Sequence, residues 1–270
     1  MRTRPGGAAL IAAIMLLSGC SLRDTDNGRD HDPANQPGYS LPQDRDGSGK
    51  DQDRDQDRDK DPDDGKQRDH VVTGERGGRQ EATFAMIKGA EVIRVRAADL
   101  GGSLYRISTP EDSKAAPAVH VDGGTVLAGL VGTDRPGPAI VTAELSNAVR
   151  WRVRLQGGAG EEIVDLTGAR VDAVELSTGA NRAEVTLPPA AGTTRVTMSG
   201  GAGQLLVHLN GDAPVRVRAG GGAGTVTVDG AVHAGVANGT VFAPAGWAQA
   251  TDRYDIDATA GVSVLTVDRR

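Results

Sequence analysis

The short sequence Gly157-Gly158-Ala159-Gly160 (GGAG) returns in related form three more times along the chain. The related motifs are STGAN at Ser177–Asn181, SGGAG at Ser199–Gly203 and GGGAG at Gly220–Gly224. Their central glycines, which are 21, 22 and 21 residues apart, are Gly158, Gly179, Gly201 and Gly222. A turn that recurs at a nearly constant interval indicates a structural repeat of that length.

The residues between these turns alternate between apolar and polar side chains. Val153 and Leu155 alternate with arginines, and Val185 and Leu187 alternate with Glu184 and Thr186. A period of two is typical of β-strands. Each interval holds two short strands and two turns, and such a unit cannot bury its apolar face unless copies stack. We therefore predict an all-β fold, a β-solenoid of stacked short strands with a repeat of about 21 residues.

The alternative fold is an ordinary β-sandwich, which is also built from short strands with frequent turns. The solenoid is favoured because a sandwich has no need of identical turns at one spacing. Glycine permits a tight reversal of the chain, and alanine is small enough for neighbouring turns to pile up. Aromatic residues make up 3% of the chain, which suits a thin interior between two sheets.

Four stretches resemble the toast-rack β-repeat proteins, a "putative adhesin" family similar to the outer domain of cell-wall-stress response proteins. The stretches are WRVRLQGGAGEEIVDL (151–166), VDAVELSTGANRAEVTLP (171–188), RVTMSGGAGQLLVHL (195–209) and PVRVRAGGGAGTVTVDG (214–230). The likeness covers residues 151–230, and Gly261–Val267 is expected as a final rung. The resemblance implies a β-solenoid and no catalytic residues.

Residues 1–20 have the pattern of a bacterial lipoprotein signal peptide. Arg2 and Arg4 precede a short apolar run that ends in Leu-Ser-Gly-Cys20, which resembles a lipobox. Cys20 is the only cysteine of the chain, and acylation would explain a lone thiol in an exported protein. We therefore expect the protein on the extracytoplasmic face of the bacterial cell membrane, anchored through lipidated Cys20.

Residues 21–80 are rich in Asp and Arg and almost free of apolar side chains. Such a segment cannot offset the entropy cost of ordering by burial, so it is predicted to be a disordered tether. One pattern within it resembles a calcium loop. Its ligand positions are Asp44, Asp46, Ser48 and Asp55. Solvated low complexity is the preferred interpretation, because Asp stands where the calcium loop has Glu and no helices flank the pattern.

Residues 81–270 are predicted to form the β-repeat domain, with the clearest repeats in 151–230. Residues 81–130 look too irregular to assign to rungs. Residues 231–257, which include Phe242 and Trp247, are expected to be an insertion or a cap, since solenoids need covered ends.

The β-repeat domain carries no sequence signature of an active site. His120, His208 and His233 have no second His or Cys at metal-ligand spacing. The glycine-rich turns match neither a nucleophile elbow nor a phosphate loop. Acidic and basic residues nearly balance in this domain, so it lacks the excess of positive charge that is typical of nucleic-acid-binding domains. We expect a protein that is not an enzyme, with no cofactor and no nucleic-acid partner.

The tripeptide Arg-Val-Arg occurs at 94–96, 152–154 and 216–218. If these strands stack in register, their arginines would form a basic stripe that contacts anionic wall polymer or lipid head groups. The proposed contact residues are Arg152, Arg154, Arg216 and Arg218. The alternative is a solvated face whose arginines are neutralised by glutamates, namely Glu144, Glu162, Glu175 and Glu184.

Three functions follow from these features. The first is a non-catalytic, lipid-anchored surface module for binding, adhesion-like contact or envelope-stress sensing, with cell-wall polymer or a membrane protein as partner. The second is a surface hydrolase acting on wall polymer or lipid, which would require a cleft where Asp252, Asp255 and Asp257 converge. The third, implied by the family resemblance, is an accessory subunit of a membrane signalling protein.

The lipid anchor gives a direct prediction. Because more than one acyl chain is needed for stable anchoring, Cys20→Ala should release the protein from the membrane and abolish palmitate labelling. Fractionation of cells labelled with palmitate measures both effects. A variant that stays with the membrane and labels as strongly as the wild type would contradict the anchor.

Overall fold

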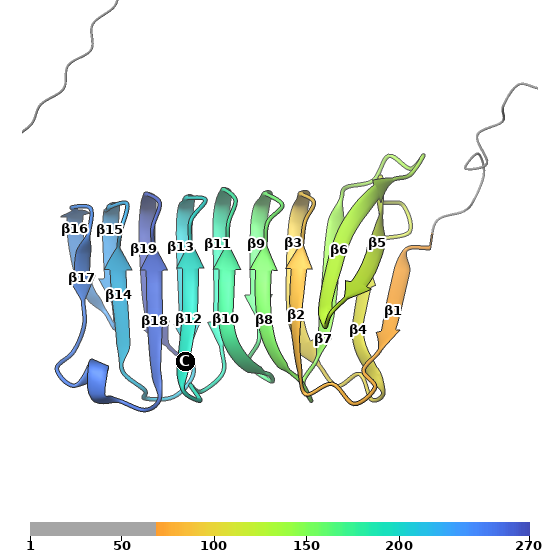
Figure 1. Ribbon diagram of the computed structural model, residues 1–270. Helices are drawn as coiled ribbons and strands as arrows, with labels where there is room; N and C mark the ends of the chain where they lie inside the picture. The colour runs from red at the N-terminus through yellow and green to blue at the C-terminus, as the bar shows by residue number, and fades with distance from the viewer. Residues whose placement is uncertain (1–68) are drawn as a thin grey trace, which may run out of the picture. The chain divides into compact units, whose positions relative to one another are not determined.

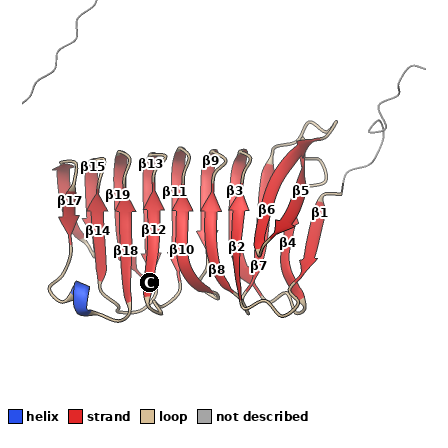
Figure 2. Ribbon diagram, in the orientation of Figure 1, coloured by secondary structure: helices blue, strands red, loops and turns tan. Residues whose placement is uncertain are grey.

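The computed structural model describes residues 69–270, which form 19 β-strands in two sheets and one short 3-10 turn (Figures 1 and 2). The all-β prediction is confirmed. Cys20, the predicted tether up to residue 68 and the calcium-like pattern at Asp44, Asp46, Ser48 and Asp55 lie outside the described residues. Within the described part of the chain, no helix is long and apolar enough to span a bilayer.

Six pairs of strands form the rungs of a two-layer stack. In spatial order they are β2 (Glu81–Met86) with β3 (Ala90–Ala98), β8 (Arg150–Leu155) with β9 (Ala159–Asp165), β10 (Arg170–Leu176) with β11 (Ala180–Leu187), β12 (Thr193–Met198) with β13 (Ala202–Leu209), β18 (Arg253–Ala258) with β19 (Val262–Arg269), and β14 (Val215–Ala219) with β15 (Ala223–Val228). The second strand of each pair belongs to the ten-stranded sheet A, and the first strand to the nine-stranded sheet B.

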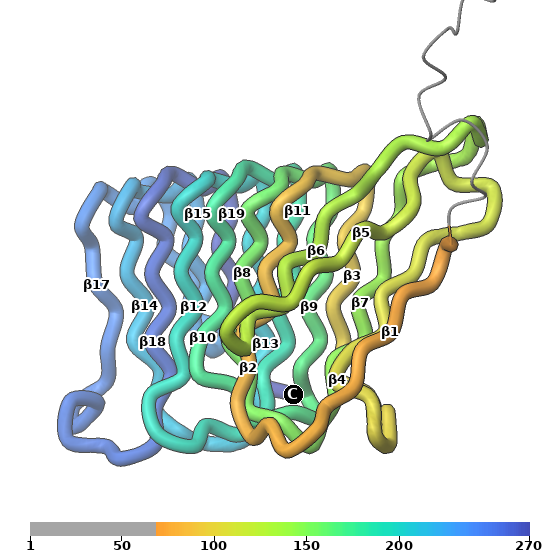
Figure 3. The backbone as a smooth tube through the Cα atoms, turned by 45° about the vertical axis from the view of Figure 1, so that its right-hand side comes forward, coloured from red at the N-terminus to blue at the C-terminus, as the bar shows by residue number. Residues whose placement is uncertain are grey.

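The remaining strands extend the two sheets at both ends of the stack. They are β1 (Val71–Glu75), β4 (Ser103–Ser108), β5 (Ala115–Asp122), β6 (Thr125–Gly132), β7 (Ile140–Ser146), β16 (Ala231–Val236) and β17 (Thr240–Phe242). The 3-10 turn η1 (Trp247–Gln249) leads back into β18. β5 lies against β1 and β4, so the two sheets meet over the core at the end of the stack that holds β1 (Figure 3).

The rungs pair in parallel and in register, which places like residues above one another. Val185 aligns with Val164 on one side and with Val207 on the other, and Val207 aligns with Val267. All four side chains are buried in one apolar cluster between the sheets. A parallel stack of this kind lets each rung cover the apolar face of its neighbour, which is the reason the two-strand unit repeats.

The turns between the strands of each rung form one row along the top of the stack (Figure 1). At the Gly157, Gly200 and Gly221 corners the backbone of the neighbouring turn comes so close that a side chain does not fit, whereas Thr178 stands at the same position of the corner between β10 and β11. A Cβ atom on Gly200 would lie 2.0 Å from the backbone carbonyl carbon of Thr178. Gly201 also has a φ of +77°, a region that glycine enters without strain. The predicted ladder of glycine corners is therefore confirmed.

The spatial order of the rungs differs from their order in the sequence. β18 pairs with β12 on one side and β14 on the other, and β19 pairs with β13 and β15. The expectation that Gly261–Val267 forms the final rung was wrong, because this rung inserts between two that precede it in the chain. The outer position is closed to it, since β15 pairs there with β16 and β14 with β17.

Two boundaries also differ from the sequence prediction. β1 begins at Val71, ten residues before the expected start of the domain at 81. Residues 81–98 are a regular rung, although residues 81–130 looked too irregular to assign. The corner Gly89-Ala90 repeats the glycine-alanine turn, but the strands β4 to β7 at 103–146 separate it from the later copies.

The close approach at the corners predicts the effect of a small substitution. Gly200→Ala should lower the free energy of unfolding by about 1–3 kcal/mol, because the added methyl group overpacks against Thr178. Gly168→Ala is a matched control, since a Cβ there would lie 3.8 Å from its nearest neighbour and the φ is ordinary. Denaturant unfolding of both variants measures the difference, and equal stabilities would contradict the stacking constraint.

Candidate functional site

The outer face of sheet B is the basic surface of the molecule. Its outward positions on β2, β8, β10, β12, β14 and β18 carry eight arginines: Arg150, Arg152, Arg154, Arg170, Arg195, Arg216, Arg218 and Arg253. They carry five carboxylates: Glu81, Asp172, Glu175, Asp255 and Asp257. Arginines therefore outnumber carboxylates on this face.

The register of sheet B aligns the predicted arginines in rows. Arg152 aligns with Ala173, then with Arg195, Asp255 and finally Arg216. Arg152 and Arg216 thus lie in one row, four strands and about 19 Å apart at the usual strand spacing. Arg154 and Arg218 end the next row, with Glu175, Thr197 and Asp257 between them.

Most of the predicted arginines already have partners within the sheet. Arg216 makes two hydrogen bonds to Asp255, at 2.9 and 2.8 Å. Its guanidinium also lies 4.0 Å from the ring centre of Trp247, which the η1 turn brings onto this face. The hydrogen bonds to Asp255 raise the pKa of Arg216 above its already high ordinary value, and the residue is held as part of the fold.

Arg154 and Arg218 are paired more loosely. Arg154 lies 3.1 Å from Glu175, and Arg218 lies 3.4 Å from Asp257. Arg152 is exposed and has no carboxylate partner within residues 69–270. Of the four predicted contact residues, Arg152 is therefore the one whose charge is available to a ligand without breaking an ion pair.

The third Arg-Val-Arg tripeptide lies on the opposite face. Arg94 and Arg96 belong to β3 in sheet A, so they do not extend the row of Arg152. Arg96 pairs there with Glu144 at 2.6 Å. The difference has a simple cause: residues 94–96 follow the glycine corner of their rung, whereas 152–154 and 216–218 precede theirs.

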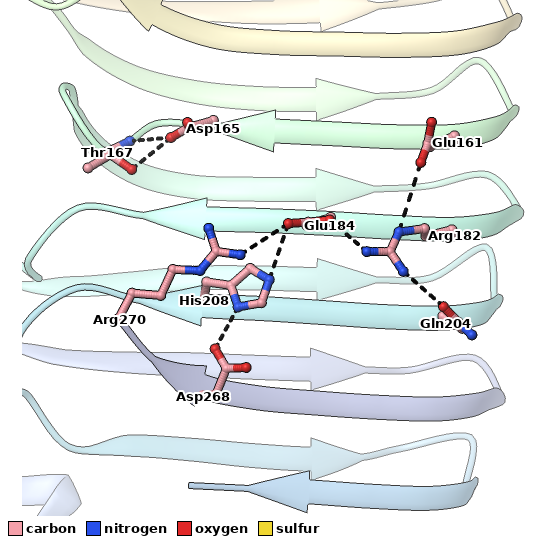
Figure 4. A network of polar contacts seen from close by, with 9 residues as sticks. All are labelled: Glu161, Asp165, Thr167, Arg182, Glu184, Gln204, His208, Asp268 and Arg270. Carbon is pink, nitrogen blue, oxygen red and sulfur yellow. Dashed lines mark hydrogen bonds and ion pairs between the residues drawn. The ribbon is translucent and has the colours of Figure 1, made fainter.

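The outer face of sheet A carries a polar network that sequence reasoning missed (Figure 4). His208 on β13 lies between Asp268 on β19, at 2.5 Å, and Glu184 on β11, at 3.3 Å. Arg182 and Arg270 also contact Glu184, at 2.8 and 3.3 Å. The hydrogen bond from Arg182 lowers the pKa of Glu184, with further lowering by the charge of His208.

This network ties three strands together across their outer face. His208 points away from the apolar core, as its position between Val207 and Leu209 predicts, yet it is only 8% exposed. Its partners come from positions 24 and 60 residues away in the chain. The 60-residue separation from Asp268 results from the inserted rung, and no local sequence signal reveals it.

Glu162 departs most sharply from the sequence prediction. It was expected to neutralise arginines on a solvated face, but it points into the core from β9 and is fully buried. Its neighbours in register are the buried Ile93 and Ala183, and neither carboxyl oxygen has a hydrogen-bond partner among the described residues. Burial raises the pKa of Glu162 to about 8, so this side chain is neutral at pH 7.

The three aspartates required by the hydrolase hypothesis do not converge. Asp252 lines a shallow hollow of about 450 Å³ beside the turns at 189–190 and 210–213, where it accepts a hydrogen bond from the backbone of Gly192. Asp255 and Asp257 lie on β18, paired with arginines of the sheet B face. Within residues 69–270, no group of three or more His, Cys, Asp or Glu residues is placed to hold a metal ion.

Comparison with solved structures identifies the class of fold. A "putative cell adhesion protein" from Clostridium sporogenes superposes with a TM-score of 0.50 at 14% sequence identity, covering 74% of this chain and 98% of that chain. "Putative adhesin" structures from Bacteroides fragilis and Parabacteroides merdae match 73% and 74% of this chain, at 10% and 9% identity. They cover 96% of each of those chains, but their TM-scores of 0.19 are too low to support an argument.

No family model and no curated protein matches this chain. The likeness to the Clostridium sporogenes protein shows a shared fold, and that protein bears a cell-adhesion name. Membership of the toast-rack family stays a prediction from the repeated sequence motifs.

The buried carboxyl group predicts how stability depends on pH. Unfolded Glu162 loses its proton near its ordinary pKa of 4.5, whereas the folded protein holds that proton up to about pH 8. The free energy of unfolding should therefore fall as pH rises from about 4.5 to 8. Glu162→Gln should remove this loss, which amounts to roughly 5 kcal/mol across the interval.

Denaturant unfolding between pH 4 and pH 8 measures the effect. Glu161→Gln is the matched control, because Glu161 is the adjacent residue on β9 and points outward. A wild-type protein and a Glu162→Gln variant with parallel pH profiles would show that Glu162 is not buried in the protonated form.

Proposed function

We propose that this protein is a non-catalytic, lipid-anchored module of the bacterial cell surface that makes adhesion-like contacts with anionic polymer through the outer face of sheet B. The observation that carries the proposal is the excess of arginine over carboxylate on that face, together with Arg152 near its centre, which has no carboxylate partner within residues 69–270. The shared fold with a protein named for cell adhesion supports the same class of function.

The geometry of the face suits a polymer better than a small molecule. Outward side chains recur at each strand, about 4.8 Å apart, so a chain with repeated anionic groups can contact several arginines in turn. Each guanidinium offers a planar fork of donors that matches phosphate or carboxylate. Many weak contacts along one chain add up to useful affinity through their high effective concentration.

The outer face of sheet A is less suited to this role. Apart from Arg94, most of its basic residues share a carboxylate: Glu184 is shared by Arg182, His208 and Arg270, and Glu144 by Arg96 and Arg106. Carboxylates at these positions would repel an anionic chain. The two faces therefore differ in charge, and the sheet B face is the one that fits an anionic partner.

Charge reversal on the two sheets tests this function. Arg152→Glu removes one unpaired positive charge from sheet B and should weaken salt-sensitive binding to purified cell-wall material about tenfold. Reversal of Arg152, Arg154, Arg216 and Arg218 together should abolish it. Co-sedimentation with cell-wall material at increasing salt measures the binding, and circular dichroism confirms that each variant is folded.

Arg94→Glu is the matched control. Arg94 is an exposed strand arginine on sheet A, also without a carboxylate partner within the described residues. Its reversal should leave binding nearly unchanged. Equal losses from Arg94→Glu and Arg152→Glu would contradict a binding face on sheet B, and unchanged binding by the fourfold variant would remove the proposal.

A further inference from the structure

The stack has one open end, formed by β16 and β17. β16 is the last strand of sheet A and pairs with β15, and β17 is the last strand of sheet B and pairs with β14. Both lie at the same end of the molecule, opposite β1 (Figures 1 and 3). Within residues 69–270, no strand pairs with the outer edge of either one, although the N–H of Thr240 on β17 already donates to the carbonyl of Ala237.

This end carries exposed apolar side chains and no charge. Val232 on β16 is 67% exposed and Val241 on β17 is 50% exposed, and these are the two most exposed large hydrophobic side chains of the described residues. The segment 230–251 contains no Asp, Glu, Lys or Arg. Natural proteins usually protect a free strand edge with charged residues or proline, and both strands lack such protection.

The interior of the stack also reaches the surface here. His233 aligns with the buried Val226, and Phe242 aligns with the buried Val217, so both rings point inward from opposite sheets. Their centroids are 4.6 Å apart. The two rings thus form the last layer of the core, and solvent reaches both of them.

The opposite end of the stack is built differently. β5 lies against β1 and β4, which brings the two sheets together over the core. β5 contains Pro117 and ends at Asp122, and β1 ends at Glu75. These are features that blunt a strand edge. The lack of charge at β16 and β17 is therefore a property of one end of the molecule.

We propose that the end formed by β16 and β17 binds a second copy of this chain, end to end, about a two-fold axis perpendicular to the sheets. Such an axis places β16 of one copy antiparallel to β16 of the other and, at the same time, β17 against β17. Each sheet then continues from one molecule into the next. The arrangement is closed, so it yields a dimer and not a filament.

The matching of two edges favours a second copy over an unrelated partner. A binding partner must offer two strand edges at the separation of sheets A and B. The same end of a second copy has two edges at that separation, because it is formed by the same β16 and β17. An uncharged surface meets its own copy without like-charge repulsion. Pairing would cover the two inward rings, place each outward valine beside a strand of the second copy, and give partners to the edge backbone groups that have none.

Sedimentation of the 270-residue chain tests the proposal. Cys20→Ala is included in every sample so that neither acylation nor a disulfide contributes to association. The parent chain should sediment as a dimer at high micromolar concentration. Val232→Lys with Val241→Lys should weaken the dimer at least about tenfold, because like charges then meet across the two-fold axis.

Val71→Lys with Val121→Lys is the matched control, since these valines are exposed on β1 and β5 at the opposite end. This control should dimerise like the parent chain. A Val232→Glu chain mixed with a Val232→Lys chain should form a heterodimer, although each associates poorly by itself. Thermal unfolding followed by circular dichroism shows that the variants retain the fold.

Several results would overturn the proposal. The first is a parent chain that is monomeric at high concentration, as it would be if residues 1–68 covered this end. The second is loss of the dimer in the control at the opposite end. The third is growth into filaments, which would replace the two-fold pairing with head-to-tail contact.

Discussion

The close parallel approach of one rung to the next is the constraint on which the rest of the structure depends. At the corner between β12 and β13, Gly200 lies so near the backbone of Thr178 that even a methyl group would overlap it. This approach keeps the strands in register from rung to rung, so that valines align with valines in the core and arginines align in rows outside. The flat outer faces and the two open strand edges are consequences of that stacking.

Stacking also explains what could be predicted from the sequence. The glycine corners and the period-two alternation predict the strand pairs from 150 to 228 and the solenoid class, because both depend on local spacing. The sheet to which each Arg-Val-Arg tripeptide belongs could also be predicted from the local sequence. It depends on whether the tripeptide precedes or follows the glycine corner of its rung. The prediction missed this for Arg94 and Arg96, which follow Gly89-Ala90.

Other features could not be read from the sequence in the same way. Neighbouring rungs share one apolar pattern, so β13 could pair equally well with β15 or with β19, and the sequence does not reveal the inserted rung. The contact of His208 with Asp268 depends on that insertion. Glu162 was named among the glutamates that would neutralise arginines on a solvated face. Its strand position places it inward, between the buried Ile93 and Ala183.

The surfaces of the molecule differ in charge. The sheet B face presents arginines, the sheet A face carries a network of paired charges around Glu184, and the end at β16 and β17 presents uncharged strand edges. A module that binds polymer along a face and a second copy through an end would offer two binding faces at once. Two linked faces bind a repetitive polymer far more tightly than one.

The central claim is that the rungs stack in the order given by the structure, with β19 between β13 and β15. Nuclear Overhauser contacts between backbone protons in the isotope-labelled chain test it most directly. The account predicts contacts from Val262 to both Ala202 and Ala223, its partners in register, and none between Ala202 and Ala223. Direct contacts between Ala202 and Ala223, with none to Val262, would contradict the inserted rung and the surfaces built upon it.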